Sequence, residues 1–389
     1  MNILLLSRYI TPDTGGGEYV ISLMAELVAK KGNMIWVISN KIEGTRSPQH
    51  KNLKIIFLLS QTIQDVKHWK QKNKLLYSLL AIKNGLSIIR KEKIDIIHSH
   101  PNQPAIVGWI LSLITRKPHI ITIHDIQSLK QEYLEEWVKQ KGNSKFKAKI
   151  ASTLTKIIHK LNYTAIHTVS ENTRDDLIKL GIKKPIYVIH NAIPIHEPEN
   201  IETVPFQFVH ISRLEFHKNL QVVIRCIPIV KKFFPNILLL VIGEGGYRDT
   251  LEKLVVSLNL QKNVIFKGHV SDNEKKFMLS SSNALLFPSL HEGFGMVILE
   301  AFAQRKPVIV SRIRPMSDIV EHERTGLVVS PHDEKAWANS ILYLLQYPKE
   351  ASKMGENGRN VIEEKYCLEF MSNQIMQMYS DIMKSYYNK

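Results

Sequence analysis

The run from His291 to Ala301 combines two carboxylates with a glycine loop. Glu292 and Glu300 flank Gly293-Phe294-Gly295, directly after a short apolar run expected to be a strand. The loop therefore opens a helix, and its unpaired N–H groups and the helix dipole can bind an anion. Carboxylates suit the same place if the anion carries hydroxyl groups, as a sugar or ribose does. The alternative is a surface loop with two solvated acids.

A second group, Ser212–Asn219, follows the first strand expected in the second half of the chain. Arg213 offers a planar donor fork and Lys218 a mobile point charge. This pair suits a diphosphate whose negative charge grows as it departs. A solvated strand edge is the alternative interpretation.

The first half contains two further candidate groups. Gly15-Gly16-Gly17 follows the first strand and lets the backbone approach a phosphate or sugar, although a tight turn without ligand is an equal alternative. Neither a dinucleotide-binding glycine pattern nor a P-loop is present. His124-Asp125 follows a later strand, where the imidazole could hydrogen-bond a sugar or phosphate and Asp125 could orient it or cap the next segment. A purely structural pair is the alternative.

We expect no metal site. His98 and His100 have no Cys or carboxylate at matching spacing, and no Asp-x-Asp occurs in the chain. Cys226 and Cys367 are far apart, which favours neither a disulfide framework nor a zinc site and fits a reducing cytoplasm.

Short, continuously apolar runs alternate with helical patterns in both halves, as expected for parallel strands buried on both faces. The Pro-rich polar segment His190–Pro205 separates the two series. We therefore predict an α/β protein with two doubly wound domains, 1–195 and 196–365, and a closing helix in 366–389 that packs back towards the first domain. The expected strands are Ile3–Leu6, Met34–Ile38, Lys54–Leu59, Ile94–Ile97, His119–Ile123, Ala165–Val169 and Ile186–Ile189, then Phe206–Ile211, Ile237–Ile242, Val264–Phe266, Ala284–Phe287, Val308–Val310 and Leu327–Val329.

Composition sets wider bounds. The chain has 389 residues, 44% of them apolar, and a net charge of +16, which excludes one small domain and an acidic disordered tail. Residues 51–160 carry 20 basic and 7 acidic side chains, a surplus of 13 that requires an anionic partner or a reason for its absence. The apolar stretch Pro104–Thr115 is too short to cross a bilayer, and the first residues lack signal-peptide features.

Part of this surplus follows helical spacing. In Lys145–Leu161 an apolar face lies beside a basic stripe, a pattern suited to an anionic membrane surface. The alternative is that the apolar face packs on the sheet and leaves the lysines in water. A second such helix begins with Lys67, Lys70 and Lys74. The basic stripe of the first helix is Lys145, Lys149, Lys156 and Lys160, and its apolar face is Phe146, Ile150, Leu154, Ile157, Ile158 and Leu161.

Together these groups resemble the retaining glycosyltransferases of family 4, which have the GT-B architecture of two Rossmann-like domains facing across a cleft. The resemblance extends nearly end to end, and it departs from the common family pattern at Asn191-Ala192-Ile193-Pro194 and at Arg312–Met316. The matching motifs are Gly15–Gly17, His124, Arg213 with Lys218, Gly243-Glu244-Gly245, Gly268-His269-Val270 and the Glu292/Glu300 pair.

The resemblance implies a sugar nucleotide held mainly by the second domain, with a uridine nucleotide favoured over a guanosine one, and a glycan or lipid-linked acceptor held mainly by the first. It implies no cofactor and no metal. By this analogy His124, Arg213, Lys218 and Glu292 serve catalysis: the two cations neutralise the diphosphate, and His124 meets the reacting sugar. The implied substrate-binding residues are Gly16 and Gly17 for phosphates, Gly243, Val270 for the base, Glu292 with the amides of Phe294 and Gly295 for the transferred sugar, and Glu300 for the ribose.

We therefore expect a cytoplasmic glycosyltransferase of cell-surface glycan synthesis, peripheral on the inner face of the membrane. The alternatives are a sugar-nucleotide epimerase or phosphorylase of the same fold and a nucleic-acid binder. The last is least favoured, because the chain has no aromatic-studded basic strand or zinc module.

Overall fold

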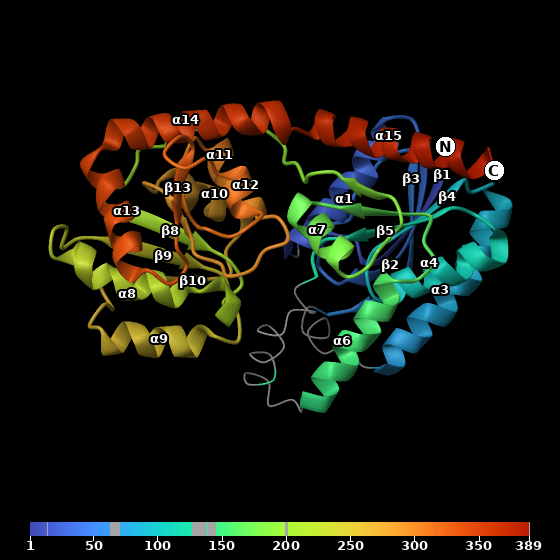
Figure 1. The fold of residues 1–389 in the computed structure, drawn as a ribbon, viewed down its shortest axis with the longest axis horizontal. Helices are drawn as coiled ribbons and strands as arrows, with labels where there is room; N and C mark the ends of the chain where they lie inside the picture. Colours follow the sequence, from blue (N-terminus) through green and yellow to red (C-terminus); the bar gives the residue numbers. More distant parts are fainter. Residues whose placement is uncertain (14, 63–70, 127–137, 139–144, 199–200, 389) are drawn as a thin grey trace. The chain divides into compact units, whose positions relative to one another are not determined.

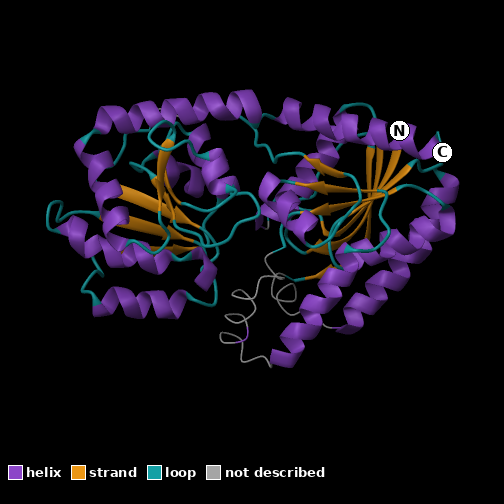
Figure 2. Cartoon of the chain, in the orientation of Figure 1, coloured by secondary structure: helices purple, strands orange, loops and turns teal. Residues whose placement is uncertain are grey.

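The computed structural model describes residues 1–13, 15–62, 71–126, 138, 145–198 and 201–388. They fall into two compact units (Figures 1 and 2). The first contains the described residues within 1–126 and 145–191 together with the helix after Leu368, and the second is Ala192–Cys367. Each unit is described here by itself.

The first unit is built on a parallel sheet of seven described strands in the order β3-β2-β1-β4-β5-β6-β7. Leu4 and Leu6 of β1 pack under Tyr77 of α3 and Val107 of α4, which lie together on one face of the sheet. Helices α1 and α15 contact each other above the other face (Figure 1). The strands are β1 Asn2–Tyr9, β2 Met34–Ile42, β3 Leu53–Gln61, β4 Ile96–Ser99, β5 His119–Ile123, β6 Ala165–Thr168 and β7 Ile186–Val188, and the helices are α1 Gly15–Lys30, α3 Gln71–Lys91, α4 Gln103–Thr115, α6 Lys145–His159, α7 Glu171–Lys179 and α15 Leu368–Tyr387.

The second unit repeats this design with a parallel sheet of six described strands, β10-β9-β8-β11-β12-β13. Its main core lies between the sheet and helices α8, α9 and α13, and Trp337 is fully buried there. The strands are β8 Gln207–Ile211, β9 Leu238–Ile242, β10 Val264–Gly268, β11 Leu285–Phe287, β12 Val308–Ser311 and β13 Gly326–Val329, and the helices are η2 Phe216–Lys218, α8 Leu220–Lys231, α9 Arg248–Ser257, α10 Asp272–Ser280, α11 Met296–Ala303, α12 Met316–Ile319, α13 Glu334–Gln346 and α14 Pro348–Lys365.

Each predicted strand is present, so the predicted pair of doubly wound α/β domains is confirmed. The central strands β4, β5, β6 and β12 are buried throughout, as expected for parallel strands covered on both faces. The edge strand β3 is buried only at its ends, Leu53 and Gln61, and its other residues are half-buried or exposed. None of the helices that the structure describes combines the length and the apolar character that a bilayer crossing requires.

A directed chain of hydrogen bonds fixes α15 to the first sheet. Burial lowers the pKa of His98 well below 6.5 and that of His167 to about 4, so both rings are neutral at pH 7. The Ile189 carbonyl can only accept, so Nε2 of His167 donates to it at 3.4 Å. Nδ1 of His167 then accepts from the Thr122 hydroxyl at 2.8 Å.

The same donor–acceptor argument determines the directions of the two remaining hydrogen bonds. Having donated its one proton, the Thr122 hydroxyl accepts from Nε2 of His98 at 2.7 Å. Nδ1 of His98 is therefore an acceptor, and the hydroxyl of Tyr379 in α15 donates to it at 2.7 Å. Each proton in the chain has one place, and Tyr379 is the donor that begins it.

Replacing Tyr379 by Phe should lower the free energy of unfolding by about 1–3 kcal/mol, because a buried acceptor on His98 loses its donor. The matched control is Tyr386→Phe in the same helix, whose exposed hydroxyl donates to the Arg116 carbonyl at 3.3 Å and should contribute under about 0.5 kcal/mol. Urea unfolding of both variants measures the difference. Equal losses of unfolding free energy in the two variants would contradict this chain of hydrogen bonds.

Candidate functional site

The candidate residues lie where the two parallel sheets change winding direction. In the first sheet this point falls between β1 and β4, and in the second between β8 and β11. The connections that leave neighbouring strands in opposite directions open a crevice beyond their carboxyl ends, where ligands of open α/β sheets bind. Arg213 and Lys218 follow β8, and Glu292 follows β11.

A buried asparagine ties the loops at this edge of the second sheet. Asn219 adopts the left-handed conformation (φ 56°) between η2 and α8, which asparagine tolerates better than most residues. Its side-chain amide donates to the carbonyl of Pro288 after β11 (3.1 Å) and to that of Pro331 after β13 (2.7 Å). The Leu290 amide also donates to the His217 carbonyl at 2.8 Å. The loop that carries Glu292 is therefore fixed against the loop that carries Lys218.

Lys218 and Glu292 meet in an ion pair with Nζ and Oε1 2.5 Å apart. The two side chains are only 12% and 11% exposed, so water screens the pair weakly. Arg213 lies in the same loop and is exposed. The structure thus brings together the sequence-predicted Lys218 and Glu292 and leaves the Arg213 guanidinium accessible to an anion.

His217 is a member of this group that the motif analysis did not single out. Burial, and then the positive charges of Lys218, Arg213 and His291, lower its pKa to about 3. The ring is therefore neutral at pH 7, in a basic environment. The position of His217 within the Ser212–Asn219 run could have indicated it from the sequence, but its closeness to His291 depends on the fold.

Backbone hydrogen bonds extend this edge to the loops after β9 and β10. The Gly243 amide donates to the Gly268 carbonyl (2.8 Å), and the Leu214 amide to the Glu244 carbonyl (2.9 Å). A Cβ on Gly243 would lie 1.9 Å from the Ser212 carbonyl oxygen, and its φ of 127° also requires glycine. Val270 follows β10 at the same edge and is half-buried.

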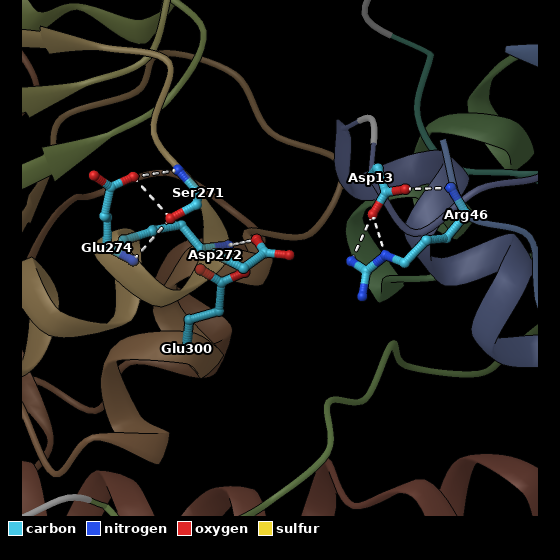
Figure 3. A network of polar contacts seen from close by, with 7 residues as sticks. Asp13, Arg46, Ser271, Asp272, Glu274 and Glu300 are labelled. Atoms are coloured by element: carbon cyan, nitrogen blue, oxygen red, sulfur yellow. Dashed lines mark hydrogen bonds and ion pairs between the residues drawn. The ribbon is translucent and has the colours of Figure 1, made fainter. Parts of the chain in front are cut away.

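Glu300 is engaged by a lysine rather than free. Its Oε1 accepts from Nζ of Lys275 at 3.1 Å, and Lys275 also pairs with Asp272 at 3.4 Å. Burial disfavours the charge of Lys275, but the two carboxylates outweigh that effect and raise its pKa. The start of α10 beside this group is fixed by a capping box between Ser271 and Glu274 (Figure 3).

Phe294 and Gly295 form the start of α11. The Phe294 ring is buried, with its edge against Tyr366, so this position offers a ligand its backbone. Gly295 is the N-cap with φ 105°, and a Cβ there would crowd Ile298. The Ile298 amide donates to the Gly295 carbonyl at 2.9 Å, and the positive end of the helix dipole at the start of α11 favours an anion.

In the first unit Gly16 and Gly17 lie in the first turn of α1, and a Cβ on Gly17 would meet open space. The preceding loop is held by Asp13, which accepts from the Arg46 backbone amide and side chain at 2.6 and 2.8 Å (Figure 3). Arg46 lowers the pKa of Asp13. Asp13 is therefore fixed before the glycines, and the space around Gly17 is open.

His124 follows β5 and is half-buried. Its Nε2 lies 3.2 Å from Nδ1 of the buried His100, and burial lowers the pKa of His124 to about 4. Among the described residues no group of three His, Cys, Asp or Glu side chains is arranged to hold a metal ion.

Known protein families and solved structures match this chain. Residues 14–197 match the family described as Glycosyltransferase Family 4, and residues 192–361 match Glycosyl transferases group 1. Sucrose-phosphate synthase from Thermosynechococcus elongatus has the same fold (TM-score 0.80, 21% identity, 99% of each chain). So does HepE from Anabaena in complex with UDP-glucose (TM-score 0.74, 18% identity, 98% of this chain and 100% of that chain). The O-antigen chain mannosyltransferase RfbU of Salmonella typhimurium is 29% identical over 60% of this chain and 62% of its own length.

These matches and the two parallel sheets define a glycosyltransferase of the GT-B fold. The two family matches together span residues 14–361, and the chain belongs to glycosyltransferase family 4. It is thus a transferase enzyme, as the sequence predicted.

Replacing Asn219 by Gly should loosen the loops it ties, because glycine keeps the left-handed backbone but removes both hydrogen bonds. We expect amide hydrogen exchange to quicken at least 10-fold, about 1.4 kcal/mol of lost local stability, around residues 289–292 and near Ser330. Asn263→Ala is the matched control, because its side chain donates to the Pro235 and Ile237 carbonyls at the opposite end of the strands. It should quicken exchange only there. Equal protection of the 289–292 loop in both variants would contradict the role of Asn219.

Proposed function

We propose that the protein is a retaining, metal-independent glycosyltransferase. It transfers a sugar from a nucleotide diphosphate, uridine being favoured over guanosine, to a hydroxyl of a glycan or lipid-linked acceptor. The observation that carries this proposal is the group after β8 and β11, in which the pair Lys218–Glu292 is held in place beside the exposed Arg213. The UDP-glucose bound to HepE and the O-antigen name of RfbU support the donor and acceptor classes.

The chemical step breaks the bond between the sugar's anomeric carbon and the β-phosphate oxygen. Both electrons go to the leaving diphosphate, and the sugar gains oxocarbenium character. In this proposal Arg213, Lys218 and the first amides of α11 stabilise the growing negative charge, which is the largest effect available to such a site. The acceptor hydroxyl attacks from the face that the diphosphate leaves, and its proton passes to the departing phosphate oxygen.

The other residues have binding roles in this proposal. Glu292 holds Lys218 by its Oε1 and accepts from the transferred sugar with its other oxygen. The amides of Phe294 and Gly295 contact the same sugar. Glu300 accepts from the ribose with the carboxylate oxygen that Lys275 does not engage, Gly243 lets the backbone approach the donor, and Val270 contacts the base. In the first unit Gly16 and Gly17 approach the phosphates, and His124 contacts the reacting sugar.

Replacing Arg213 or Glu292 by Ala should lower kcat for transfer at least 100-fold. The first variant removes a donor to the leaving diphosphate, and the second releases Lys218 from its place. Release of the nucleotide from a panel of uridine, guanosine and adenosine sugar nucleotides, with and without acceptor, measures this. Product analysis distinguishes transfer from epimerisation or phosphorolysis. The anomeric configuration of the product tests retention. Activity in the presence of a chelator tests metal independence.

The second unit supplies matched controls. Arg225 and Glu334 form an exposed ion pair at 3.6 Å on α8 and α13. Arg225→Ala and Glu334→Ala change the same residue types and should leave kcat unchanged. Full activity of both Arg213→Ala and Glu292→Ala would refute the proposed site.

Helix α6 presents its apolar side to solvent. It packs on its unit through Ala148, Ser152 and His159, which are 3–7% exposed. Four apolar side chains of the predicted stripe lie about 180° away on the helix. Ile158, on the border between the two sides, and Leu161, after the end of α6, pack against the core. The expectation that this stripe packs on the sheet is therefore wrong for those four residues, which are Phe146 (72% exposed), Ile150 (44%), Leu154 (55%) and Ile157 (53%).

Lysines line one border of this apolar side. Lys149, Lys156 and Lys160 are exposed between the packed side and the apolar side, whereas the side chain of Lys145 lies outside the described residues. In α3 the residues Leu75 and Leu79 are also exposed, while Tyr77 and Ala81 pack inward. Lys67 and Lys70 lie outside the described residues. We propose that α6 lies on an anionic membrane surface, with its apolar side chains in the interface and its lysines on phosphate groups.

Changing Lys149, Lys156 and Lys160 together to Gln should weaken binding to anionic vesicles, because each lysine near such a surface contributes about 1 kcal/mol. We expect at least a 10-fold loss of the partition coefficient in sedimentation with phosphatidylglycerol vesicles. The control makes the same charge change in the second unit at Lys232, Lys253 and Lys262 and should retain binding. Equal sedimentation of the native protein with neutral and anionic vesicles would refute the proposal.

A further inference from the structure

Three histidine rings form a column at the carboxyl edge of the first sheet. His98 and His100 stack with centroids 5.7 Å apart and 11° between their planes, and His100 and His124 stack at 5.4 Å and 13°. Exposure rises along the column, because His98 is fully buried, His100 is 4% exposed and His124 is half-buried. The column therefore leads from the core to the edge where this fold binds ligands.

His100 has little freedom to move. Its backbone amide donates to the Leu6 carbonyl of β1 at 3.0 Å. One face of its ring lies on His98, which Tyr379 and Thr122 hold at both nitrogens. The hydrogen bond from His100 to His124 thus transmits a fixed orientation to the outer ring.

The arrangement leaves one nitrogen of each outer ring without a described partner. Nδ1 of His100 and Nε2 of His124 are 3.2 Å apart, so one of them carries the proton and the other accepts. Nε2 of His100 is buried and has no hydrogen-bond partner among the residues that the structure describes. If His100 accepted at Nδ1, its proton would lie on that buried Nε2, and a buried N–H without an acceptor is the rarer and costlier case.

We propose that His100 is a positioning residue that sets the tautomer of His124. His100 donates from Nδ1 to Nε2 of His124, so the proton of His124 lies on Nδ1, the one nitrogen left to meet a ligand. His124 then donates to an oxygen of the bound substrate, a sugar hydroxyl or a phosphate oxygen. This proposal rests on the proposed function only for the identity of that substrate.

Two substitutions separate the hydrogen bond from simple packing. His100→Asn places a side-chain amide donor near the position of Nδ1. His100→Leu fills the space without a donor. The control is Ser99→Ala, which removes the 2.7 Å hydrogen bond from Ser99, the residue before His100, to His119 of β5 and does not touch His124.

The first measurement needs no substrate. Nitrogen chemical shifts of the imidazoles at pH 7, in protein labelled at its 16 histidines and assigned with His124→Gln, report the tautomer. We expect His124 to be protonated at Nδ1 in the native protein, in His100→Asn and in Ser99→Ala, and to become a tautomer mixture in His100→Leu. A native His124 protonated at Nε2, or an unchanged signal in His100→Leu, would overturn the proposal.

The second measurement uses transfer kinetics. We expect His100→Leu to lower kcat at least 10-fold with KM for the sugar nucleotide changed less than 2-fold, and His100→Asn and Ser99→Ala to stay within 3-fold of the native kcat. Equal losses in His100→Leu and Ser99→Ala would mean general packing damage and overturn the role of His100. If the native protein transfers no sugar, the proposed function fails, and the tautomer measurement still decides this proposal.

Discussion

The carboxyl edge of the second sheet depends on the two hydrogen bonds of Asn219. A parallel sheet brings the carboxyl ends of its strands to one edge, but it does not determine the conformations of the loops that follow. Asn219 removes that freedom, because its buried amide joins the loop after β8 to the Pro288 and Pro331 carbonyls. The Lys218–Glu292 pair is short because these loops are already joined. A site that must hold donors against a departing charge gains from such preorganisation.

The two units differ in the charge of the side chains at the carboxyl edges of their sheets: the second has cations, and the first has neutral imidazoles. The second sheet presents Arg213 and Lys218, and their charges help keep His217 neutral. The first sheet carries imidazoles that burial keeps neutral: the protons of the buried His98 and His167 follow a directed chain from Tyr379, and His124 lies nearer the edge. A neutral donor such as His124 can meet a hydroxyl or phosphate without adding charge. The cations of one edge suit a diphosphate, whereas the neutral donors of the other suit orientation.

The sequence predicted the strands, because buried strands leave a local signal, and the candidate site residues were proposed from local signals of the same kind. Buried parallel strands such as β9 are unbroken apolar runs, and Glu292 stands in a glycine loop at a helix start. Asn219 and His100 escaped prediction as functional residues because their partners are distant in sequence or lie on another strand. The sequence left open which side of α6 packs, because small residues such as Ala148 allow a close approach that hydrophobicity alone does not indicate.

The outward apolar side of α6 and the positive charge surplus of the first half of the chain are explained by the same binding surface. Exposing a large apolar side chain costs about 2 kcal/mol relative to burial, so a helix with four of them in water gains by covering them. A protein surface could cover them, but the surplus of 20 basic over 7 acidic residues in 51–160 would repel most basic partners and favours an anionic one. An anionic lipid surface supplies both requirements at once, apolar chains for the outward face and phosphates for Lys149, Lys156 and Lys160. The same surface would hold a lipid-linked acceptor, which connects the charge of the first unit to the chemistry proposed for the second.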